Sequence, residues 1–568
     1  TMHMAPGVPI MASTDLANWR TIGYCYSTMA NSDAFNLANG KDAYGYGSWA
    51  SSLRYKNGTY YVLVPSNTTN RTHLYTSKDI RNGPWKETVL PFWHDPSLVM
   101  EDDGRNFVLY GNGDIRVVEL NADLSGVKVG GENRLLIANA SGFAGSVGLK
   151  SEGSHLEKIN GWYYLFTICY VNGKGRTELV HRSKTLLGTY EGKIALQSQG
   201  VAQGSVVQDS SGKWWGYLFQ DNGSVGRSPW MMPVTWVNDW PVFNGGVAPT
   251  SFTTNLPSSA AGSGFVTSDD FSSTKLPLEW QWNHNPDNAN WSLSARPGWY
   301  RIKTARVDRD VLWARNTLTQ RTFGPKSSAR VSLDASGMKD GDVAGLLALQ
   351  SKYGYVAVKK NGSANSIVMV NAASGSAVEV ATAPVSQNRL YPRIDMDFTN
   401  RTDKATFFYS TDSVNWKQIG NTLQMEYTLP KHFMGYRFGL FAYSTKSAGG
   451  TADFDWFRIG ASYKDELRLD PGPVAVSDKT TESARAPFFV RSGPSSLTVG
   501  YEVVQQGRVE IALWDIRGNR AATLVDREHQ LGGFEVETSS TGLPGGRYLL
   551  VQSQDGRVVA SRMVAVAR

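Results

Sequence analysis

A polar turn that ends in glycine and leads into an aromatic strand occurs four times in the first 215 residues of the chain. The glycines of these turns are Gly58, Gly104, Gly161 and Gly212, with spacings of 46, 57 and 51 residues. Asn-Gly and Asp-Gly turns supply the positive φ angles of tight hairpins. A period of about 50 residues with hairpins and aromatic strands is typical of a β-propeller, in which each repeat is one four-stranded blade.

The composition agrees with an all-β fold. Hydrophobic residues make up 41% of the 568 residues and charged residues 19%, which is ordinary for a globular chain. Aromatic residues reach 11%, and the 57 glycines favour strands joined by tight turns. A β-sandwich with coincidental turns is the alternative, but it does not explain the fourfold hairpin.

Charge and cysteine content exclude several functional classes. The net charge of +7 comes from 57 basic and 50 acidic residues without a basic tract, so no nucleic-acid partner is expected. No run of 18 apolar residues is present, so no membrane-spanning helix is predicted. The two cysteines, Cys25 and Cys169, exclude a disulfide scaffold and a cysteine-rich metal site.

Two stretches rich in Pro, Gly, Ser and Thr, at about residues 245–264 and 465–487, predict domain boundaries. They divide the chain into a propeller over residues 1–247, a second block over 264–462 and a third over 485–568.

A shared offset points to a site in the first block. Nine residues before the four hairpin glycines stand Trp49, Asp95, Glu152 and Gln203. A constant offset places these side chains at one level of the innermost strands, which line the channel of a propeller. An indole, two carboxylates and an amide would converge there, as they do in sites for sugars, where paired carboxylates perform acid–base chemistry.

Each of these residues also has a purely structural interpretation. Asp95 could form a turn, Glu152 could be solvated, and Gln203 could brace the channel. For Trp49, core packing and stacking on a sugar remain equally open. The shared offset favours a functional role for the two carboxylates.

The repeat also predicts a first blade that is incomplete in this chain. Ser13, Thr14, Asp15, Leu16 and Trp19 match the outer turns that follow the hairpins of the later blades. Counting back by the spacing of those blades puts the channel residue of the first blade about 16 to 19 residues before Thr1. We therefore expect five blades, the first without its inner strand.

The first block resembles glycoside hydrolase family 43, the five-bladed propeller of β-xylosidases and α-L-arabinofuranosidases. The stretches that carry the resemblance cover essentially all of residues 1–245. They are His3–Ile10, Ser13–Trp19, Gly47–Ser52, His94–Ser97, Glu152–Ser154, Gln203–Gly204, Gly226–Arg227 and Trp236–Val242.

The resemblance implies an inverting glycosidase with three acids. Glu152 matches the general acid that protonates the leaving oxygen, and Asp95 matches the acid that tunes and orients this proton donor. The third, an Asp that acts as general base, belongs to the first inner strand, which is expected before Thr1. Without it, base assistance worth roughly 10²–10⁴-fold would be lost. Another group could substitute, or the chain could be inactive, but we expect upstream residues to supply the base.

The resemblance also bears on ligands. Much of the family has a His in the fifth blade that helps to hold a central metal ion, whereas this chain has Ala202, so no cofactor is expected to be required. Arg227 matches an arginine that reaches substrate hydroxyls, with bracing of the channel by ion pairs as the alternative. The family pocket accepts a terminal pentose, most commonly xylose, and the candidates for its wall are His3, Trp49, Trp93 and Trp230.

The second block alternates apolar and polar residues, as in a jelly-roll β-sandwich. Asp269–Phe271, Trp280–Pro286 and Asp453–Phe457 resemble the concanavalin-like sandwich often appended to xylosidases of this family. In such proteins the sandwich packs on the propeller and can help to close the pocket. Asp270 and Asp455, near the first and last strands, could share a calcium ion, and solvated turns are the alternative.

The third block, with Val509–Gly518 and Leu543–Leu550, is similar to small immunoglobulin-like domains that end secreted bacterial proteins. We therefore expect a secreted, periplasmic or cell-surface protein. The predicted function is release of terminal pentose, xylose before arabinofuranose, from plant cell-wall oligosaccharides. A non-catalytic carbohydrate-binding propeller and a structural adhesin are the alternatives.

Overall fold

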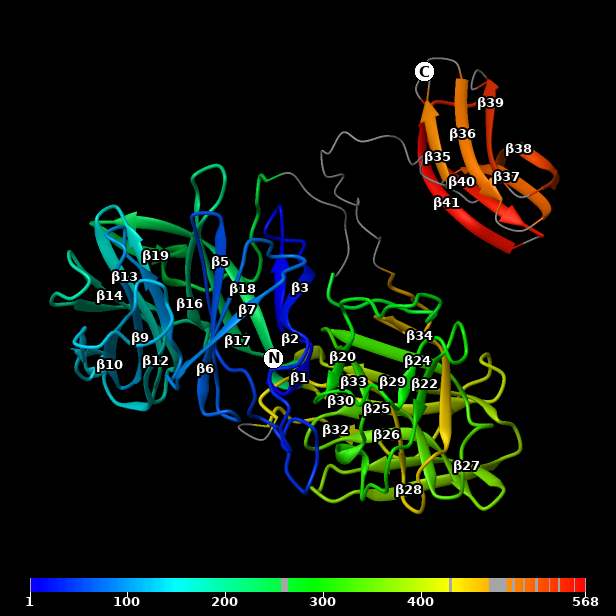
Figure 1. Cartoon of the computed structure of the whole chain (residues 1–568), viewed down its shortest axis with the longest axis horizontal. Helices are drawn as coiled ribbons and strands as arrows, with labels where there is room; N and C mark the ends of the chain where they lie inside the picture. Colours follow the sequence, from blue (N-terminus) through cyan, green and yellow to red (C-terminus); the bar gives the residue numbers. More distant parts are fainter. Residues whose placement is uncertain are drawn as a thin grey trace. The chain divides into compact units, whose positions relative to one another are not determined.

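A computed structural model describes residues 2–256, 264–428 and 432–468 of the chain. Of the C-terminal part it describes residues 488–492, 496–503, 506–515, 519–530, 532–539, 542–555 and 557–566. The regular structure of these residues is almost entirely strand (Figure 1). The helical elements of this part are five short 3-10 turns: η1 (Gly142–Ala144), η2 (Gly223–Val225), η3 (Asn244–Gly246), η4 (Val311–Trp313) and η5 (Thr399–Arg401). The predicted all-β class is confirmed.

The first block forms a series of antiparallel sheets, each built from consecutive strands. The first sheet pairs β2 (Gly7–Ala12) with β3 (Arg20–Tyr26). The second and third contain β4 (Ser52–Lys56), β5 (Thr59–Ser66), β6 (Arg71–Ser77) and β7 (Lys86–Pro91), then β8 (Ser97–Met100), β9 (Asn106–Asn112), β10 (Asp114–Leu120) and β11 (Asn133–Ile137). The fourth and fifth contain β12 (Val147–Ile159), β13 (Trp162–Val171), β14 (Gly175–Ser183) and β15 (Glu191–Leu196), then β16 (Ala202–Gln208), β17 (Trp214–Asp221), β18 (Arg227–Val237) and β19 (Trp240–Phe243).

The hairpin glycines lie where the repeat predicts them, between the first and second strands of the four-stranded sheets. At the β4–β5 turn, Asn57 and Gly58 have φ angles of 51° and 74°. Asn160 and Gly161, at the β12–β13 turn, have φ angles of 49° and 76°. Two successive positive φ angles are the signature of a type I′ turn, which explains the Asn-Gly pairs. A Cβ atom on Gly58 or Gly161 would meet no neighbour, so the backbone angle alone requires glycine there.

The first sheet differs from the next four. It has two strands, whereas each of the others has four. The number of blades, and a first blade without its inner strand, stay predictions.

The second block is a sandwich of two antiparallel eight-stranded sheets. One contains, in spatial order, β1 (Met4–Ala5), β20 (Gln281–Asn283), β23 (Leu318–Arg321), β33 (Arg437–Ser444), β25 (Asp342–Leu349), β26 (Gly354–Asn361), β27 (Ala364–Asn371) and β28 (Val378–Val385). The other contains β21 (Trp291–Ser292), β22 (Tyr300–Lys303), β34 (Thr451–Gly460), β24 (Lys326–Asp334), β29 (Arg389–Asp397), β30 (Lys404–Ser410) and β31 (Lys417–Gln418), with β32 (Leu423–Gln424) also pairing with β30. Alternate residues such as Val331, Leu346, Ile394 and Phe438 are fully buried in one core between the sheets.

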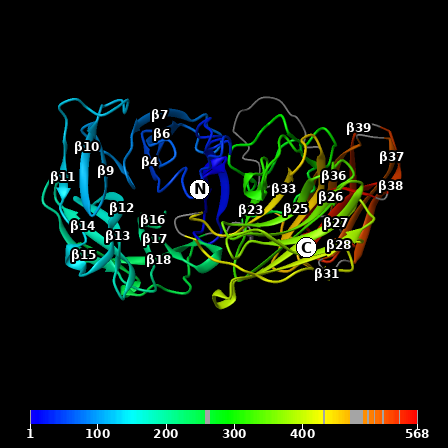
Figure 2. The same ribbon diagram turned by 90° about the horizontal axis from the view of Figure 1, so that it is seen from below.

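The propeller and the sandwich share a strand. β1 comes from the first block of the sequence but pairs with β20, so that Met4 lies opposite Asn283. In both views the N-terminal segment lies between the two groups of sheets (Figures 1 and 2). Residues 1–472 accordingly form one compact unit, and the sequence boundary at about residue 250 does not separate two independent bodies.

Residues 473–568 form the second unit. Its described strands make a three-stranded sheet of β35 (Phe488–Ser492), β36 (Ser496–Val503) and β39 (Gly532–Ser539). They also make a four-stranded sheet of β38 (Arg520–His529), β37 (Gly507–Asp515), β40 (Gly546–Gln554) and β41 (Arg557–Val566). Val499, Ile511 and Leu550 are fully buried in the core of this unit. Two antiparallel sheets over one core form a β-sandwich, and the immunoglobulin-like assignment stays a prediction. No helix in the described part of the chain is long and apolar enough to cross a membrane.

Candidate active site

The four residues found by the nine-residue offset come together in the propeller. Ligand atoms of Asp95, Glu152 and the neighbouring His94 all lie within 4.8 Å of one another. The Trp49 ring is 6.1 Å from the His94 ring, edge to face. On the other side of the carboxylates, Gln203 lies so close to Gly153 that a Cβ atom there would be 2.9 Å from its Cγ atom. A constant sequence offset from equivalent hairpins has thus predicted a spatial cluster.

Irregular backbone geometry sets the directions of these side chains. The φ angles of Asp95 and Gln203 are 45° and 60°, in the left-handed region that few non-glycine residues occupy. Gly153 follows Glu152 with a φ of 72°, and the pairing of β12 with β13 shifts register on both sides of Glu152. Such bulges bend a strand and redirect its side chains, and they are common next to active sites.

Two donors hold one oxygen of Glu152. The Nε2 atom of His94 lies 3.0 Å from Glu152 Oε2, and Nδ2 of Asn112 donates to the same oxygen at 2.7 Å. The Glu152 side chain is 16% exposed, so it is fixed by neighbours and still open to a ligand.

Asp95 is the deeper carboxylate, with 5% of its surface exposed. Burial raises the pKa of Asp95 to about 6; the negative charge of Glu152 also raises it, while His94 and Arg227 oppose the shift. Burial lowers the pKa of His94, but its hydrogen bond to Glu152 and the charges of both carboxylates outweigh burial, so this pKa is raised. The protonation of Asp95 and that of His94 therefore depend on the charged groups beside them, as is common in acid–base sites.

The spacing of the carboxylates limits their roles. In an inverting glycosidase the acid and the base are about 6.5–9.5 Å apart, because a water molecule must fit between base and sugar. Asp95 and Glu152 approach within 4.8 Å. Asp95 is thus too close to Glu152 to activate that water, and its position suits a group that tunes Glu152.

The sandwich contributes one wall of the site. The Phe433 ring stacks on Trp49, with 5.6 Å between centroids and 7° between planes. The Arg227 guanidinium lies 4.2 Å from the centre of the same Phe433 ring. The Tyr436 amide donates to the Ser224 carbonyl at 2.9 Å. This bond attaches the segment just before β33 to η2 of the propeller. Phe433 thus places the sandwich against Trp49 and Arg227, and its role in closing a pocket stays a prediction.

Contacts within the protein already engage part of the Arg227 guanidinium. Its Nε atom lies 3.3 Å from Asp221, which also receives an N–H from Arg176 at 2.7 Å. Arg227 also covers the Phe219 ring at 4.3 Å. Bracing by an ion pair is therefore present, and contact with substrate hydroxyls stays a prediction.

Two of the residues proposed for the wall are buried. His3 is 1% exposed and packs against Tyr44, His284 and His432, so it offers no open surface to a sugar. Trp93 is 4% exposed in a core with leucines of neighbouring sheets. Trp230, on β18, is partly buried beside another hydrophobic core, and its place in the wall stays a prediction.

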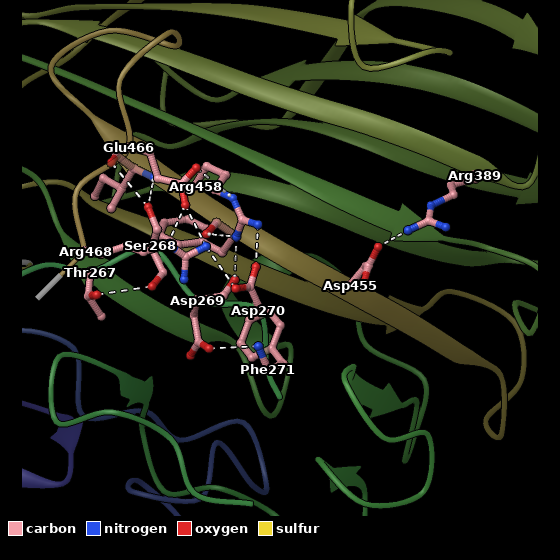
Figure 3. Close-up of polar contacts among 12 residues, drawn as sticks. Thr267, Ser268, Asp269, Asp270, Phe271, Arg389, Asp455, Arg458, Glu466 and Arg468 are labelled. Carbon is pink, nitrogen blue, oxygen red and sulfur yellow. Dashed lines mark hydrogen bonds and ion pairs between the residues drawn. The ribbon is translucent and has the colours of Figure 1, made fainter. Parts of the chain in front are cut away.

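The proposed calcium pair in the sandwich is also corrected. Asp270 forms ion pairs with Arg458 and Arg468, whereas Asp455 pairs with Arg389 (Figure 3). The close-up shows the two carboxylates directed to different arginines. Because an arginine already neutralises each carboxylate, the pair does not fit a shared calcium site.

The channel has a group of potential metal ligands of its own, His94, Asp95 and Glu152. The His94 Nε2 atom is engaged with Glu152, and calcium prefers oxygen ligands. Ala202, at the place of the metal-holding histidine expected from the family, offers no ligand atom. We derive no step through a metal.

Sequence reasoning missed four residues of this site. The sequence analysis assigns no role to His94, next to Asp95, and none to Asn112, which lies between Gly111 and Gly113. Glu178 is fully buried on β14 and accepts the Gln203 amide at 2.6 Å; burial raises its pKa well above the usual value, against the opposing amides of Gln203 and Gly204. Phe433 lies about 200 residues beyond the propeller, so no local signal could have found it.

Comparison with known proteins agrees with this geometry. Residues 1–241 match the family model described as glycosyl hydrolases family 43. Residues 268–460 match the model of the beta xylosidase C-terminal concanavalin A-like domain. The chain belongs to glycoside hydrolase family 43. It is therefore a glycoside hydrolase with the concanavalin-like sandwich that family 43 xylosidases carry.

Relatives within family 43 include a beta-xylosidase of Formosa agariphila, 29% identical over 80% of this chain and 85% of that protein. A non-reducing end alpha-L-arabinofuranosidase of Bacteroides ovatus is 26% identical over 80% of this chain and 89% of that protein. Among solved structures, a bifunctional GH43-CE protein of Bacteroides eggerthii is 49% identical with a TM-score of 0.79. That match covers 81% of this chain and 60% of the other, so the chain spans about three fifths of that protein's length.

Proposed function

We propose that this protein is an exo-acting, inverting glycoside hydrolase that releases terminal pentose, with xylose as the first candidate, from xylan-derived oligosaccharides. In this proposal Glu152 is the general acid and Asp95 is the group that tunes and orients it. The observation that carries the proposal is the pairing of a buried carboxylate with a second, partly open carboxylate at the channel.

The two carboxylates have different surroundings, and the difference suits a division of labour. Glu152 reaches the surface of the site, so it can give a proton to the glycosidic oxygen of the leaving sugar. Asp95 lies beside Glu152 and is less exposed, a position that suits a group which tunes and orients a proton donor. The water that attacks the anomeric carbon needs a further carboxylate, a role that we give to neither residue.

The remaining walls are compatible with a small sugar. The stacked rings of Trp49 and Phe433 supply an apolar surface, and Arg227 beside them supplies N–H donors. Sites for sugars combine such aromatic surfaces with a few polar groups that set orientation. Xylose is favoured because the Formosa agariphila relative is a beta-xylosidase.

Arabinofuranose is the second candidate, favoured by the name of the Bacteroides ovatus relative, a non-reducing end alpha-L-arabinofuranosidase. A third candidate is a propeller that binds oligosaccharides without cleaving them. We also propose that the protein acts outside the cytoplasm, where plant cell-wall oligosaccharides are met.

The test compares 4-nitrophenyl β-D-xyloside with 4-nitrophenyl α-L-arabinofuranoside, using the complete protein and its Glu152→Gln variant. We expect faster release of nitrophenol from the xyloside, and a fall in kcat of roughly 10²–10⁴-fold on xylobiose in the variant. Faster cleavage of the arabinofuranoside would assign that sugar instead. Xylobiose that remains intact with the wild-type protein would support the binding propeller.

A further inference from the structure

The turn between β9 and β10 lies against the proposed general acid and is built to hold one side chain there. It reads Gly111-Asn112-Gly113. The Gly111 amide donates to the carbonyl of His94 at 3.2 Å, and the Gly113 amide donates to the carbonyl of Ser151 at 2.7 Å. The turn is thus attached to the residue before Asp95 and to the residue before Glu152.

Both glycines are required by the backbone. The φ angles of Gly111 and Gly113 are 145° and 84°, outside the range that other residues adopt readily. A Cβ atom on Gly111 would collide with the carbonyl of Asp114, and one on Gly113 would lie 2.9 Å from the Lys150 side chain. The tight turn therefore fixes the position of Asn112 relative to Glu152.

The side chain of Asn112 completes an asymmetric set of hydrogen bonds. Its Nδ2 atom donates to Glu152 Oε2 at 2.7 Å, and His94 Nε2 lies 3.0 Å from the same oxygen. The same His94 nitrogen is 3.8 Å from Asp95 Oδ2, so acceptors surround it and the tautomer with the proton on Nε2 is favoured. Glu152 Oε2 thus receives two N–H donors.

We infer that Asn112 and His94 are positioning residues that occupy both lone pairs of Glu152 Oε2, so that Oε1 carries the proton and delivers it to the leaving group. This inference rests on the proposed role of Glu152 as general acid. A carboxyl oxygen with two N–H donors has no lone pair left for a proton. The proton of the acid form is then confined to Oε1, and after its transfer the same two donors stabilise the carboxylate.

The proton moves in one step. The Oε1–H bond breaks as the glycosidic oxygen takes the proton and the bond from that oxygen to the anomeric carbon breaks. Glu152 is left as a carboxylate. Water supplies the hydroxyl of the released sugar, and its other proton goes to the further carboxylate that the proposed function requires as general base.

The experiment compares two substrates that differ in their need for the proton, xylobiose and 2,4-dinitrophenyl β-D-xyloside. The second has a leaving group that departs as a stable anion, so acid catalysis matters little. For Asn112→Ala we expect kcat/KM to fall about 10- to 100-fold on xylobiose and less than about threefold on the dinitrophenyl xyloside.

The isosteric Asn112→Asp variant sharpens the test. Its carboxylate would accept a hydrogen bond from a protonated Oε2 and draw the proton away from the leaving group. We therefore expect a larger loss on xylobiose than for Asn112→Ala, with the same weak effect on the dinitrophenyl xyloside. Asn121→Ala is the matched control, because Asn121 is a half-buried asparagine just beyond the other end of β10 whose side chain donates to Ser125.

Glu152→Gln separates the two proposals. If this variant loses activity mainly on xylobiose while both Asn112 variants lose equally on the two substrates, Asn112 is not a positioning residue and Glu152 remains the acid. If Glu152→Gln itself shows no preference between the substrates, the acid assignment fails and the inference about Asn112 fails with it.

Discussion

Two aspartates of this protein are equally buried and have opposite surroundings. Asp95 in the propeller and Asp453 in the sandwich are each 5% exposed. Asp453 receives N–H groups from Arg296 at 2.8 Å and from Arg301 at 2.6 Å and 2.7 Å. Asp95 instead faces a histidine and a second carboxylate. The comparison shows that burial alone does not mark a functional acid; what matters is whether the fold neutralises the charge or leaves it unbalanced.

The two aspartates differ in the free energy that ionisation costs in the folded protein. A buried carboxylate with two arginines is stabilised in its ionised form, whereas a buried carboxylate beside another carboxylate is destabilised in that form. For Asp95 this is expressed in a pKa raised by burial, and further by Glu152, to about 6. Three substitutions test this contrast.

Asp95→Asn should have the largest effect: it should lower the activity and raise the stability of the folded protein. Without the carboxylate proposed to tune and orient Glu152, kcat on xylobiose should fall about 100-fold. The folded protein should become more stable at pH 8, because an acid with a raised folded-state pKa binds its proton more tightly when folded. Its stabilising contribution is complete below the unfolded-state pKa and is lost as the pH rises to about 6 and above.

The size of this gain follows from the shift. We expect the free energy of unfolding to rise by about 1–2 kcal/mol at pH 8 and to stay nearly unchanged at about pH 4. Denaturant unfolding at the two pH values measures it. A loss of stability at pH 8 would show that Asp95 is ionised in the folded state without cost.

Asp453→Asn is the same chemical change at the other buried aspartate and should have the opposite effect on stability. Arg296 and Arg301 would lose the negative charge of their shared partner. Both arginine side chains are about a third exposed, so water would make up part of the lost interaction. We expect the free energy of unfolding to fall by about 1–3 kcal/mol. Activity on 4-nitrophenyl xyloside should stay within twofold of wild type, and a large fall in kcat without unfolding would contradict the contrast.

Asp455→Asn should have the smallest effect. Its partner Arg389 is 46% exposed, and exposed ion pairs contribute less than about 1 kcal/mol. In addition, millimolar calcium or a chelator should leave the melting temperature of the wild-type protein unchanged. If calcium raised the melting temperature and Asp455→Asn abolished that increase, the carboxylate would bind a cation after all.

Sequence reasoning succeeded where local chemistry repeats. Hairpin geometry is set by two turn residues, so equal offsets from Gly58, Gly104, Gly161 and Gly212 led to side chains that meet in space. It failed where a partner comes from far along the chain. The calcium prediction for Asp270 and Asp455 could not include the arginines that pair with them, and the contact of Phe433 with Trp49 joins residues almost 400 positions apart.

Two residues of the predicted pocket wall, His3 and Trp93, are buried for another reason. They were selected by residue type, and type does not decide between a ring in a core and a ring in a pocket. Asn112 could have been found, because an asparagine between two glycines at the expected end of an inner hairpin indicates a constrained turn.

The pairing of β1 with β20 also sets an order of events during synthesis. Met4 and Ala5 bond to Asn283 and Trp282, about 280 residues later in the chain. A ribosome that adds 5–20 residues per second needs roughly 15–55 seconds to produce that partner strand. During that time the segment that contains Asp95 and Glu152 is already outside the ribosome, while β1 has no partner strand yet. The site can therefore be completed only after the sandwich has begun to emerge, and chaperones that shield an unpaired edge would act in that interval.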